Sequence, residues 1–365
     1  MSRKLLFVID QLEIGGAGRV ASILMNELAA RGYDVSVVTA VKYHAINYKL
    51  ADSIKVKEWY DPEPVRHGFF GRVANMYRRC CYFRRALKEV KPDVIVAFTH
   101  NIFFYTKLWS WGYRGPIIAS DHTSMGRDLG RFSNYLRHNF YKRADVVTIL
   151  TEKDARILGD KLPNKEVVYN PVTFDTFNGE TDREKKVLCV GRKSFWSVKG
   201  FDRIIKIWGD LYPKYPDWKL EIVGESNADS DAKLQSMITE AGIGKGVVMH
   251  GNTNEIERFY RSAEIFALPS RVEGFPLVLV EAMSQGCACV SFSMQGAVSE
   301  IINDGEDGVI VEDGNLEEFS ARLEQLMKNA ELRLRYANNA KENVVRFSIA
   351  TFADKWEQLI KRVLK

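Results

Sequence analysis

The sequence predicts an α/β protein made of two doubly wound parallel-sheet domains, and three observations predict it. Short β-rich apolar runs alternate with stretches of helical periodicity, as parallel strands require, because each crossover must pass over a face of the sheet. The alternation stops at a polar interval, residues 173–186, and then restarts. The chain has 365 residues, which exceeds the usual size of one domain.

The first domain is predicted to begin with a β-α-β unit. Residues 4–10 form an apolar strand, and the glycine-rich turn of residues 15–18 follows it. The next apolar residues recur at helical spacing: Val20, Ile23, Leu24 and Leu28. Gly32 ends this helix, and residues 34–40 form the second strand. Further strands are expected at residues 94–98, 116–120 and 146–150.

The second domain repeats the alternation. Its strands are expected at residues 187–190, 219–223, 247–250, 264–268 and 288–292. We therefore divide the chain into an N-terminal Rossmann-like domain, residues 1–172, and a C-terminal Rossmann-like domain, residues 173–350. Residues 351–365 form a helix with one apolar face, which either closes its own domain or packs back on the first.

Composition and charge limit the class of protein. With 46% hydrophobic and 27% charged residues, the chain is neither disordered nor collagen-like. The net charge of +5 is unevenly divided, because residues 1–170 hold 27 Lys and Arg against 17 Asp and Glu, whereas residues 171–365 hold 25 against 30. A basic first half favours an anionic partner, either a membrane surface or a nucleic acid.

The sequence predicts a cytoplasmic protein, either free or peripheral on the inner face of the cytoplasmic membrane. No apolar run approaches the roughly 18 residues of a membrane span, and the run at residues 5–9 is too short for the core of a signal peptide. The five cysteines are an odd number without a C-x-x-C pair, which favours reduced thiols over disulfides or a zinc site.

The pattern that most strongly indicates a functional site lies in residues 265–286, which run from a buried strand through a short loop into a helix. In a parallel α/β sheet, ligands bind at the carboxyl ends of strands, and this loop lies at such an end. Gly274 allows the backbone to approach a ligand closely, and Pro276 suits the first helical turn. Free backbone N–H groups there, together with the helix dipole, favour a bound phosphate.

Charged residues flank this loop and a second one. Glu273 and Glu281 lie eight positions apart, and a carboxylate accepts hydrogen bonds from neighbouring sugar hydroxyls. Arg192 and Lys199 follow the strand of residues 187–190 and are cations suited to neutralise a diphosphate leaving group. Each pair also has an ordinary alternative, chance spacing for the glutamates and a solvated surface pair for the cations.

Five motifs occur together in one order. They are Gly15-Gly16-Ala17, KPDVI at residues 91–95, Asn170-Pro171, the GR and KG pairs within residues 191–200, and the E-x7-E pair Glu273/Glu281. With these motifs the chain resembles, over nearly its whole length, the retaining glycosyltransferases of family 4, which have the GT-B fold of two Rossmann-like domains facing across a cleft. Residues 273–283 are similar to bacterial enzymes that build surface polysaccharides (lipopolysaccharide, capsule) and lipid-linked oligosaccharides, often from UDP-sugars.

The resemblance implies a role for each motif residue. Arg192 and Lys199 would hold the donor diphosphate, Glu281 would accept the ribose hydroxyls, and Glu273 would lie against the donor sugar. Asn252 would line the base pocket. The other nucleotide-sugar-binding residues that it implies are Gly15, Gly16, Gly274, Phe275, Pro276 and Leu277.

His122 completes the expected catalytic set of Glu273, Arg192 and Lys199. It follows the predicted strand of residues 116–120 and matches the family histidine that contacts the donor sugar. The ordinary alternative is a histidine that caps a strand end. One loop departs from the family, because many relatives have GGAER where this chain has Gly18 in place of Glu. An acid-dependent acceptor contact at that loop is therefore in doubt.

The implied reaction breaks the anomeric C–O bond of a nucleotide-sugar with retained configuration, through an oxocarbenium-like transition state. Negative charge develops on the departing diphosphate, so its stabilisation by Arg192, Lys199 and the helix N-terminus is the main task. The leaving phosphate would itself take the acceptor proton, and Glu273 as a covalent nucleophile is the minority option. Asp229 and Asp231 lie in a helix-capping region, so neither a metal nor another cofactor is expected.

Rival enzyme classes share some of these motifs. Gly16, Gly18 and Ala21 match the dinucleotide fingerprint of oxidoreductases, but the strand of residues 34–40 has no acidic residue near its end to hold a ribose. A sugar phosphorylase or a nucleotide-sugar epimerase of the GT-B fold would use the same phosphate-binding residues. UDP is favoured only by similarity, and the donor sugar, the acceptor and the oligomeric state stay open.

A non-catalytic alternative rests on the basic first half. Its densest run, residues 69–91, interleaves basic and aromatic residues. The candidate contacts with anionic lipid headgroups or with a saccharide or polyprenyl-diphosphate acceptor are Arg78, Arg79, Arg84 and Arg85. The ordinary alternative is the solvated face of a core helix. Nucleic acid is not expected as a partner, because the sequence contains no recognised RNA- or DNA-binding module.

Overall fold

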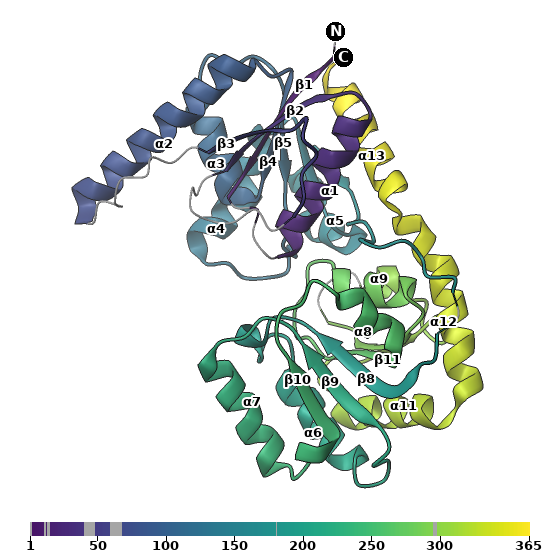
Figure 1. Cartoon of the computed structure of the whole chain (residues 1–365). Coiled ribbons are helices and arrows are strands. Elements are labelled where there is room, and N and C mark those ends of the chain that lie inside the picture. Colours follow the sequence, from purple (N-terminus) through teal and green to yellow (C-terminus); the bar gives the residue numbers. More distant parts are fainter. Residues whose placement is uncertain are drawn as a thin grey trace. The chain divides into compact units, whose positions relative to one another are not determined.

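The computed structural model describes residues 2–10, 12, 15–39, 48–58, 68–179, 181–294 and 298–365. The chain divides into two compact units (Figure 1). Unit 1 comprises Met1–Pro171 and Ile349–Lys365, and unit 2 comprises Val172–Ser348. The divisions fall within two residues of the predicted boundaries after residues 172 and 350, and the C-terminal helix belongs to unit 1.

Unit 1 is built on a parallel sheet in the order β3-β2-β1-β4-β5-β6-β7 among the described residues. The strands are β1 (Lys4–Ile9), β2 (Asp34–Thr39), β3 (Lys55–Glu58), β4 (Val94–Phe98), β5 (Ile117–Ser120), β6 (Val146–Ile149) and β7 (Lys165–Val167). The five predicted strands are all present. The sequence did not indicate the two edge strands, β3 and β7, which are short and carry charged residues.

Helices cover the sheet of unit 1. They are α1 (Gly16–Ala30), α2 (Gly68–Val90), α3 (His100–Trp109), α4 (Arg131–Tyr135), α5 (Glu152–Leu158) and α13 (Ile349–Val363). A π-helical turn, Leu136–Phe140, and short 3-10 turns at Tyr141–Arg143 and Gly159–Lys161 complete the unit. The core lies between the sheet and these helices and includes Leu6, Phe83, Ile95 and Phe103.

The C-terminal helix α13 is amphipathic and packs on α1 within unit 1 (Figure 1). Its buried residues are Phe352, Ala353, Trp356, Leu359 and Ile360. Polar contacts hold its outer edge, because Arg31 forms an ion pair with Asp354 at 2.7 Å and the Tyr33 hydroxyl donates to Glu357 at 3.2 Å. The apolar face predicted from the sequence is therefore buried within unit 1.

Unit 2 is built on a second parallel sheet, in the order β10-β9-β8-β11-β12-β13. The strands are β8 (Glu184–Val190), β9 (Lys219–Val223), β10 (Val247–His250), β11 (Ala263–Leu268), β12 (Ala288–Phe292) and β13 (Val309–Val311). The helices are α6 (Phe201–Leu211), α7 (Ala228–Glu240), α8 (Ile256–Ser262), α9 (Leu277–Ser284), α10 (Val298–Ile301), α11 (Leu316–Lys328) and α12 (Ala330–Val344). Short 3-10 turns lie at Lys193–Phe195, Gly244–Gly246 and Val345–Phe347. The sequence missed β13, a three-residue edge strand.

The strand orders locate a ligand-binding edge in each sheet. In unit 2 the order reverses between β8 and β11, and in unit 1 it reverses between β1 and β4. Open α/β sheets bind ligands outside the carboxyl ends of the strands at such switch points. The loops that follow these four strands are therefore where a site is expected.

No helix in the described ranges combines the length and apolar character that crossing a bilayer requires. All five cysteines are free thiols. Three of them, Cys189, Cys287 and Cys289, are buried in unit 2, and burial raises the pKa of each. These buried thiols are packing residues and not reactive groups.

Candidate active site

A charged pair occupies the switch point of unit 2. The loop after β8 brings Lys199 against Glu273, which lies in the loop after β11, with 2.8 Å between Nζ and Oε1. The Ser270 hydroxyl donates to the same Glu273 oxygen at 2.8 Å. Both charged side chains are half-buried. Two residues predicted from separate motifs, 74 positions apart, thus meet at one point of the fold.

Glycines allow the two loops to come this close. Gly200 caps the start of α6 in the left-handed conformation, with φ of +70°. A Cβ at this position would lie 1.9 Å from the carbonyl oxygen of Pro269, the first residue after β11. Gly191 leaves room for the stem of Lys199, whose Cδ would lie 3.3 Å from a Cβ there. In the predicted KG and GR pairs, the glycines therefore allow the close packing, and Lys199 and Arg192 supply the charge.

A bidentate ion pair fixes the same two loops. The Arg271 guanidinium donates to both carboxylate oxygens of Asp202, at 2.8 and 2.6 Å. Its backbone N–H donates to the Val198 carbonyl at 2.8 Å. The Asp202 carboxylate raises the pKa of Arg271, opposing the effect of partial burial. The sequence did not indicate this pair, because the two residues lie 69 positions apart in the chain.

Arg192 lies in the same loop as Lys199 but points to a different partner. It is exposed, and its guanidinium stacks on the ring of Phe195 with 4.7 Å to the ring centroid. The stack holds a long side chain without neutralising it. Arg192 thus keeps its charge at the carboxyl end of β8.

The helix α9 begins beside Glu273. Pro276 is the residue before its first turn, one position earlier than expected, and no side chain of the described residues caps the helix. Phe275 is buried and lies edge-on to Phe347, at 5.4 Å between ring centroids, which fixes the backbone where Gly274 meets α9. An N-terminus without a side-chain cap directs its N–H groups and its dipole at whatever lies in front of it.

Glu281 is separated from this cluster by its place on α9. It is buried, one carboxylate oxygen accepts from the Thr173 hydroxyl at 2.6 Å, and the other accepts from the Tyr260 hydroxyl at 2.9 Å. A carboxylate oxygen can accept more than one hydrogen bond. The ribose contact expected of Glu281 stays a prediction, and the contacts in this structure hold α8 and the segment after Pro171 to α9.

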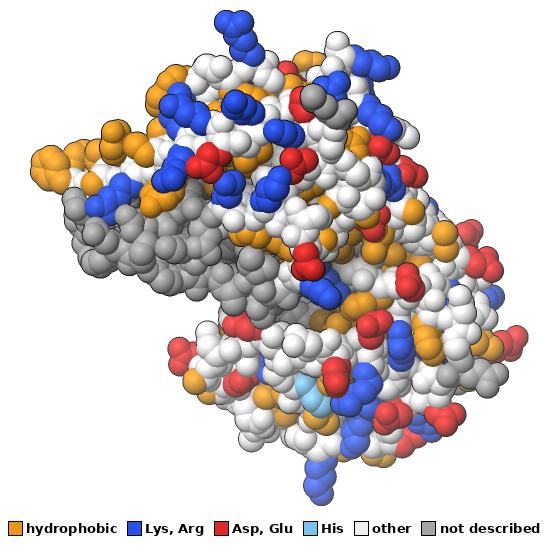
Figure 2. All heavy atoms as spheres, turned by 45° about the horizontal axis from the view of Figure 1, so that its top comes forward, with side chains coloured by type: hydrophobic (Ala, Val, Ile, Leu, Met, Phe, Trp, Pro, Cys, Tyr) orange, Lys and Arg blue, Asp and Glu red, His pale blue; other side chains and the backbone are white. Residues whose placement is uncertain are grey.

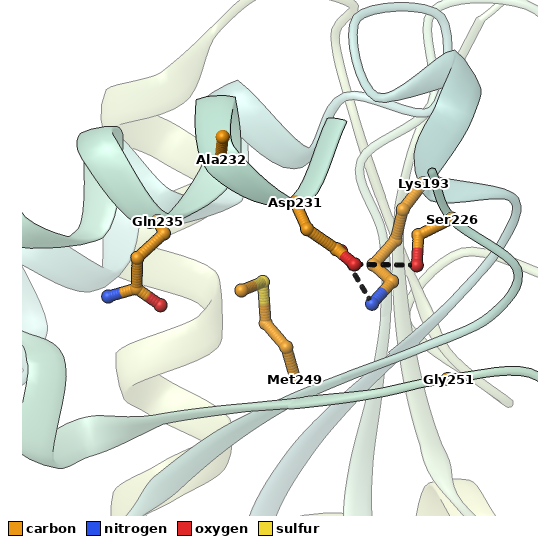
Figure 3. Close-up of a pocket in the computed structure, with 7 residues that line it drawn as sticks. All are labelled: Lys193, Ser226, Asp231, Ala232, Gln235, Met249 and Gly251. Carbon is orange, nitrogen blue, oxygen red and sulfur yellow. Dashed lines mark hydrogen bonds and ion pairs between the residues drawn. The ribbon is translucent and has the colours of Figure 1, made fainter. Parts of the chain in front are cut away.

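A shallow pocket of about 440 Å³ lies at the carboxyl ends of β8, β9 and β10 (Figure 3). Its lining residues are Lys193, Ser226, Asp231, Ala232, Gln235, Met249 and Gly251. Figure 3 shows Lys193 and Ser226 both reaching the Asp231 carboxylate, at 3.0 and 2.8 Å. Asn252, expected to line a base pocket, is exposed and follows Gly251.

The region of Asp229 and Asp231 is a helix cap, as predicted. Asn227 accepts from the backbone N–H of Ser230, and the Ser230 hydroxyl accepts from the Asn227 N–H, which is a capping box at the start of α7. Asp231 pairs with Lys193, and the hydrogen bonds from Lys193 and Ser226 lower its pKa against the effect of burial. This carboxylate is engaged in holding the helix.

In unit 1, His122 lies at the carboxyl end of β5. Its ring stacks on Phe98 of β4, with 4.9 Å between centroids and 6° between planes, and Nε2 lies 3.0 Å from the Ser120 hydroxyl. Its Nδ1 is buried and has no hydrogen-bond partner in the described part of the chain. Burial lowers the pKa of His122 to about 4, against the opposing effect of Asp121, so the ring is neutral at pH 7.

A second histidine, His100, lies at the carboxyl end of β4 and was missed by sequence analysis. It is buried, and neither ring nitrogen has a hydrogen-bond partner among the residues that the structure describes. Burial lowers its pKa. Thr99, directly before it, has φ of +72°, a conformation costly for a β-branched residue. Strain and unpaired buried polar atoms together are typical of a functional site.

A buried ion pair supports these histidines. Asp121 accepts from Arg137 Nε and from the Tyr141 hydroxyl, both at 2.9 Å, and all three side chains are buried. The Arg137 guanidinium also donates to the carbonyls of Thr123 and Ser124, at 2.7 and 2.9 Å. The charge of Asp121 is thus balanced within the protein and fixes the loop that carries His122.

The glycine turn after β1 is described from Gly15 onward. Gly15 precedes α1 in an extended conformation, and its backbone N–H and C=O both hydrogen-bond to the Tyr48 hydroxyl, at 3.0 and 3.2 Å. A Cβ on Gly15 would meet nothing within 4 Å. Gly16 is exposed at the start of α1. Among the residues of unit 1 that the structure describes, no steric contact therefore explains the glycine at position 15.

Two family sequence models match the chain in succession. The model of "Glycosyltransferase Family 4" matches residues 14–176, and that of "Glycosyl transferases group 1" matches residues 173–343. The chain is a glycosyltransferase of the GT-B fold and the family 4 type.

Two bacterial enzymes are similar to this glycosyltransferase over nearly the whole of both chains. The "amylovoran biosynthesis glycosyltransferase AmsD" of Erwinia amylovora is 28% identical over 98% of this chain and 99% of its own. The "GalNAc-alpha-(1->4)-GalNAc-alpha-(1->3)-diNAcBac-PP-undecaprenol alpha-1,4-N-acetyl-D-galactosaminyltransferase" of Campylobacter jejuni is 26% identical over 99% of both chains.

Solved structures share the fold of this glycosyltransferase at low sequence identity. A sucrose-phosphate synthase from Thermosynechococcus elongatus superposes with a TM-score of 0.84 over 99% of both chains, at 16% identity. HepE from Anabaena, in complex with UDP, superposes with a TM-score of 0.79 over 98% of this chain and all of its own, at 18% identity. The GT-B fold predicted from the sequence is confirmed.

Proposed function

We propose that this glycosyltransferase moves a hexosyl or N-acetylhexosaminyl group from a nucleotide-sugar to a saccharide or polyprenyl-diphosphate-linked acceptor, with retention of configuration. A UDP-sugar is the favoured donor. The reaction would serve the assembly of a bacterial surface glycan. The Lys199–Glu273 pair at the switch point of unit 2 carries the proposal. It places a cation and a carboxylate beside the N-terminus of α9, where a diphosphate and its sugar need them.

The charges at this edge suit a departing diphosphate. When the anomeric C–O bond breaks, negative charge grows on the phosphate oxygen, and donors fixed in advance stabilise it without reorganisation. Lys199 supplies a point charge, Arg192 supplies a planar fork, and α9 supplies backbone N–H groups. Glu273, held by Ser270 and Lys199, would lie against the donor sugar.

The same charges support a transfer that needs no metal ion. Mg²⁺ in other transferases neutralises the phosphates, and two cations with a helix N-terminus supply comparable charge here. The leaving phosphate would accept the proton of the acceptor hydroxyl. Glu273 would then contribute electrostatically and need not form a covalent bond. Neutral His122 would donate or accept a hydrogen bond to a hydroxyl of the donor sugar.

The relatives support the class of donor and acceptor. HepE binds UDP in its solved structure, and the Campylobacter enzyme is named for an undecaprenol-linked diphosphate acceptor. The Erwinia relative is named for amylovoran biosynthesis. These names favour UDP-sugars as first donors to test and lipid-linked saccharides as first acceptors.

The test is a transfer assay with a panel of nucleotide-sugars and lipid-linked or free saccharide acceptors, in excess EDTA. We expect a glycosylated product whose new bond has the anomeric configuration of the donor, as NMR would report. An inverted product would contradict retention, and activity that returned only with Mn²⁺ or Mg²⁺ would contradict metal independence. Release of a sugar 1-phosphate, or epimerisation of the donor, would identify a different GT-B enzyme.

A further inference from the structure

The first half of α2 buries few of its side chains. Among residues 68–79, only Gly71 is buried, whereas the second half packs on unit 1 through Phe83, Ala86 and Val90. Figure 1 shows the N-terminal half of α2 projecting away from the sheet and the other helices of its unit. Tertiary packing usually stabilises a helix in water, so a projecting half with one buried residue, Gly71, requires another explanation.

Large apolar side chains lie exposed along one face of this half. Their exposed fractions are 76% for Phe69, 85% for Phe70, 45% for Val73, 45% for Met76 and 70% for Tyr77. Their spacing of i, i+1, i+4, i+7 and i+8 places all five on one side of an α-helix. Figure 2 shows hydrophobic side chains gathered at this projecting end, with Lys and Arg beside them. We call these five residues the aromatic stripe.

The charge of α2 is strongly positive. The helix holds six basic residues and one acidic residue, Glu89. Arg72 is exposed near the aromatic stripe, and Arg78 and Arg79 are half-buried at its end. A helix with an apolar aromatic face and basic flanks is the type that lies in the interface of an anionic bilayer.

Two of the four predicted arginines have hydrogen-bond partners within unit 1. Arg84 donates to the carbonyls of Trp109 and Trp111, at 3.1 and 2.9 Å, and stacks over the Trp111 ring. Arg85 donates to Glu89 at 3.0 Å. Arg84 therefore ties the second half of α2 to the C-terminal end of α3.

We propose that the aromatic stripe docks this protein on an anionic lipid bilayer, with Phe69, Phe70 and Tyr77 in the interface and Arg72 near the lipid phosphates. An exposed face of this composition could instead pair with a second copy of the chain. Two copies would bring their basic helices together, and like charges disfavour that contact, whereas anionic lipid complements them. The proposal does not depend on the transfer reaction, because lipid binding needs neither donor nor turnover.

The test is flotation of the full-length protein with vesicles of phosphatidylcholine alone and with vesicles that also contain phosphatidylglycerol. We expect binding to the anionic vesicles, weakened by salt. The double variant Phe69→Ser, Phe70→Ser should bind at least about tenfold more weakly, because burying one such side chain is worth roughly 1.5–3 kcal/mol. Leu334→Ser, which alters a 63% exposed side chain on α12 of unit 2, is the matched control and should bind as the parent does.

Three outcomes would overturn the proposal. They are no binding of the parent protein to anionic vesicles, equal binding of the double variant, and concentration-dependent self-association that the double variant abolishes while vesicle binding is absent. A circular dichroism spectrum and a melting temperature equal to those of the parent would show that the double variant is folded. Loss of transfer activity on a soluble acceptor would instead concern the proposed reaction, so the two proposals fail separately.

Discussion

The candidate site residues at the carboxyl edges of the two parallel sheets differ in charge although the sheets share one architecture. In unit 2, β8 and β11 lead to Lys199 and Glu273, which form an ion pair at 2.8 Å. In unit 1, β4 and β5 lead to His100 and His122, and burial lowers the pKa of both rings. We infer that the fold fixes where a ligand would bind and that the charge of a few side chains would decide its class.

The chemical consequence follows from desolvation. A neutral imidazole in a buried position can exchange hydrogen bonds with uncharged hydroxyls, but it offers an anion no charge. Lysine and arginine at a helix N-terminus favour phosphate. We therefore expect unit 2 to bind the anionic part of a substrate and unit 1 to contact sugar hydroxyls.

The largest effect is expected where the charged edge depends on a glycine. Gly200→Ala should lower the free energy of unfolding by about 2–5 kcal/mol, because a left-handed L-residue costs about 1–2 kcal/mol and the clash with Pro269 adds an overpacking cost of about 1–3 kcal/mol. The measurement is chemical denaturation.

Gly242→Ala is the matched control, because Gly242 has φ of +69° but a Cβ there would meet nothing within 4 Å. Its free energy of unfolding should fall only by the conformational cost of about 1–2 kcal/mol. Equal losses for the two variants would show that the close approach of the loops does not hold this edge together.

The next largest effect is expected on catalysis, for substitutions of the charged residues at the carboxyl edge of unit 2. Lys199→Ala, Glu273→Ala and Arg192→Ala should each lower kcat/KM at least about tenfold, since a hydrogen bond to a charged group is worth about 1.5–3 kcal/mol. Lys206→Ala, an exposed lysine on α6, is the control and should leave kcat/KM unchanged. Near-normal turnover of Arg192→Ala or Lys199→Ala would remove that residue from the phosphate site.

A smaller effect is expected at the neutral edge. His122→Asn should lower kcat/KM about two- to tenfold, because a hydrogen bond between neutral groups contributes about 0.5–1.5 kcal/mol. Rising ionic strength should reduce the cost of Lys199→Ala and leave that of His122→Asn unchanged. A His122 effect that varied with salt as the Lys199 effect does would contradict a neutral ring.

The smallest effect is a pH dependence of stability. Because the pKa of His122 is lowered from 6.5 to about 4 in the folded state, the unfolded chain binds a proton more readily between these values. Stability from this group is present above pH 6.5 and is lost as the pH falls towards 4. The melting temperature of His122→Gln should therefore fall less than that of the parent between pH 7 and pH 5.

A second buried group makes that comparison specific. Burial raises the pKa of Asp154, so its effect on the pH dependence of stability is opposite in sign to that of His122. Asp154 is present in both the parent and the variant, so its effect is the same in both. The difference between parent and variant then reports on position 122. The same pH dependence of the melting temperature in both proteins would show that folding does not lower the pKa of His122.

The sequence predicted most strands because buried parallel strands are continuous apolar runs. All five residues of β4 are buried, and the pattern was plain. The edge strands β3, β7 and β13 were missed because they are short, and β3 and β7 carry Lys and Glu. Edge strands are often charged, which removes the apolar signal.

At the candidate site, sequence motifs found the residues but not their partners. Lys199 and Glu273 belong to separate motifs, and only the fold shows that they touch. Ser270 and Arg271 lie within the predicted stretch of residues 265–286, but no local signal marks their partners, and no motif marks His100. Glu281 was expected at the ligand, and its hydrogen bonds to Thr173 and Tyr260 depend on packing between distant segments.

The central claim is that the charged edge of unit 2 binds the diphosphate of a nucleotide-sugar. Isothermal titration of UDP, GDP and ADP in excess EDTA tests it most directly, with the parent protein, Lys199→Ala and Lys206→Ala. We predict binding of at least one of these diphosphates to the parent and to Lys206→Ala, and binding at least about tenfold weaker to Lys199→Ala. Equal affinity of the parent and Lys199→Ala for that nucleotide would contradict the claim.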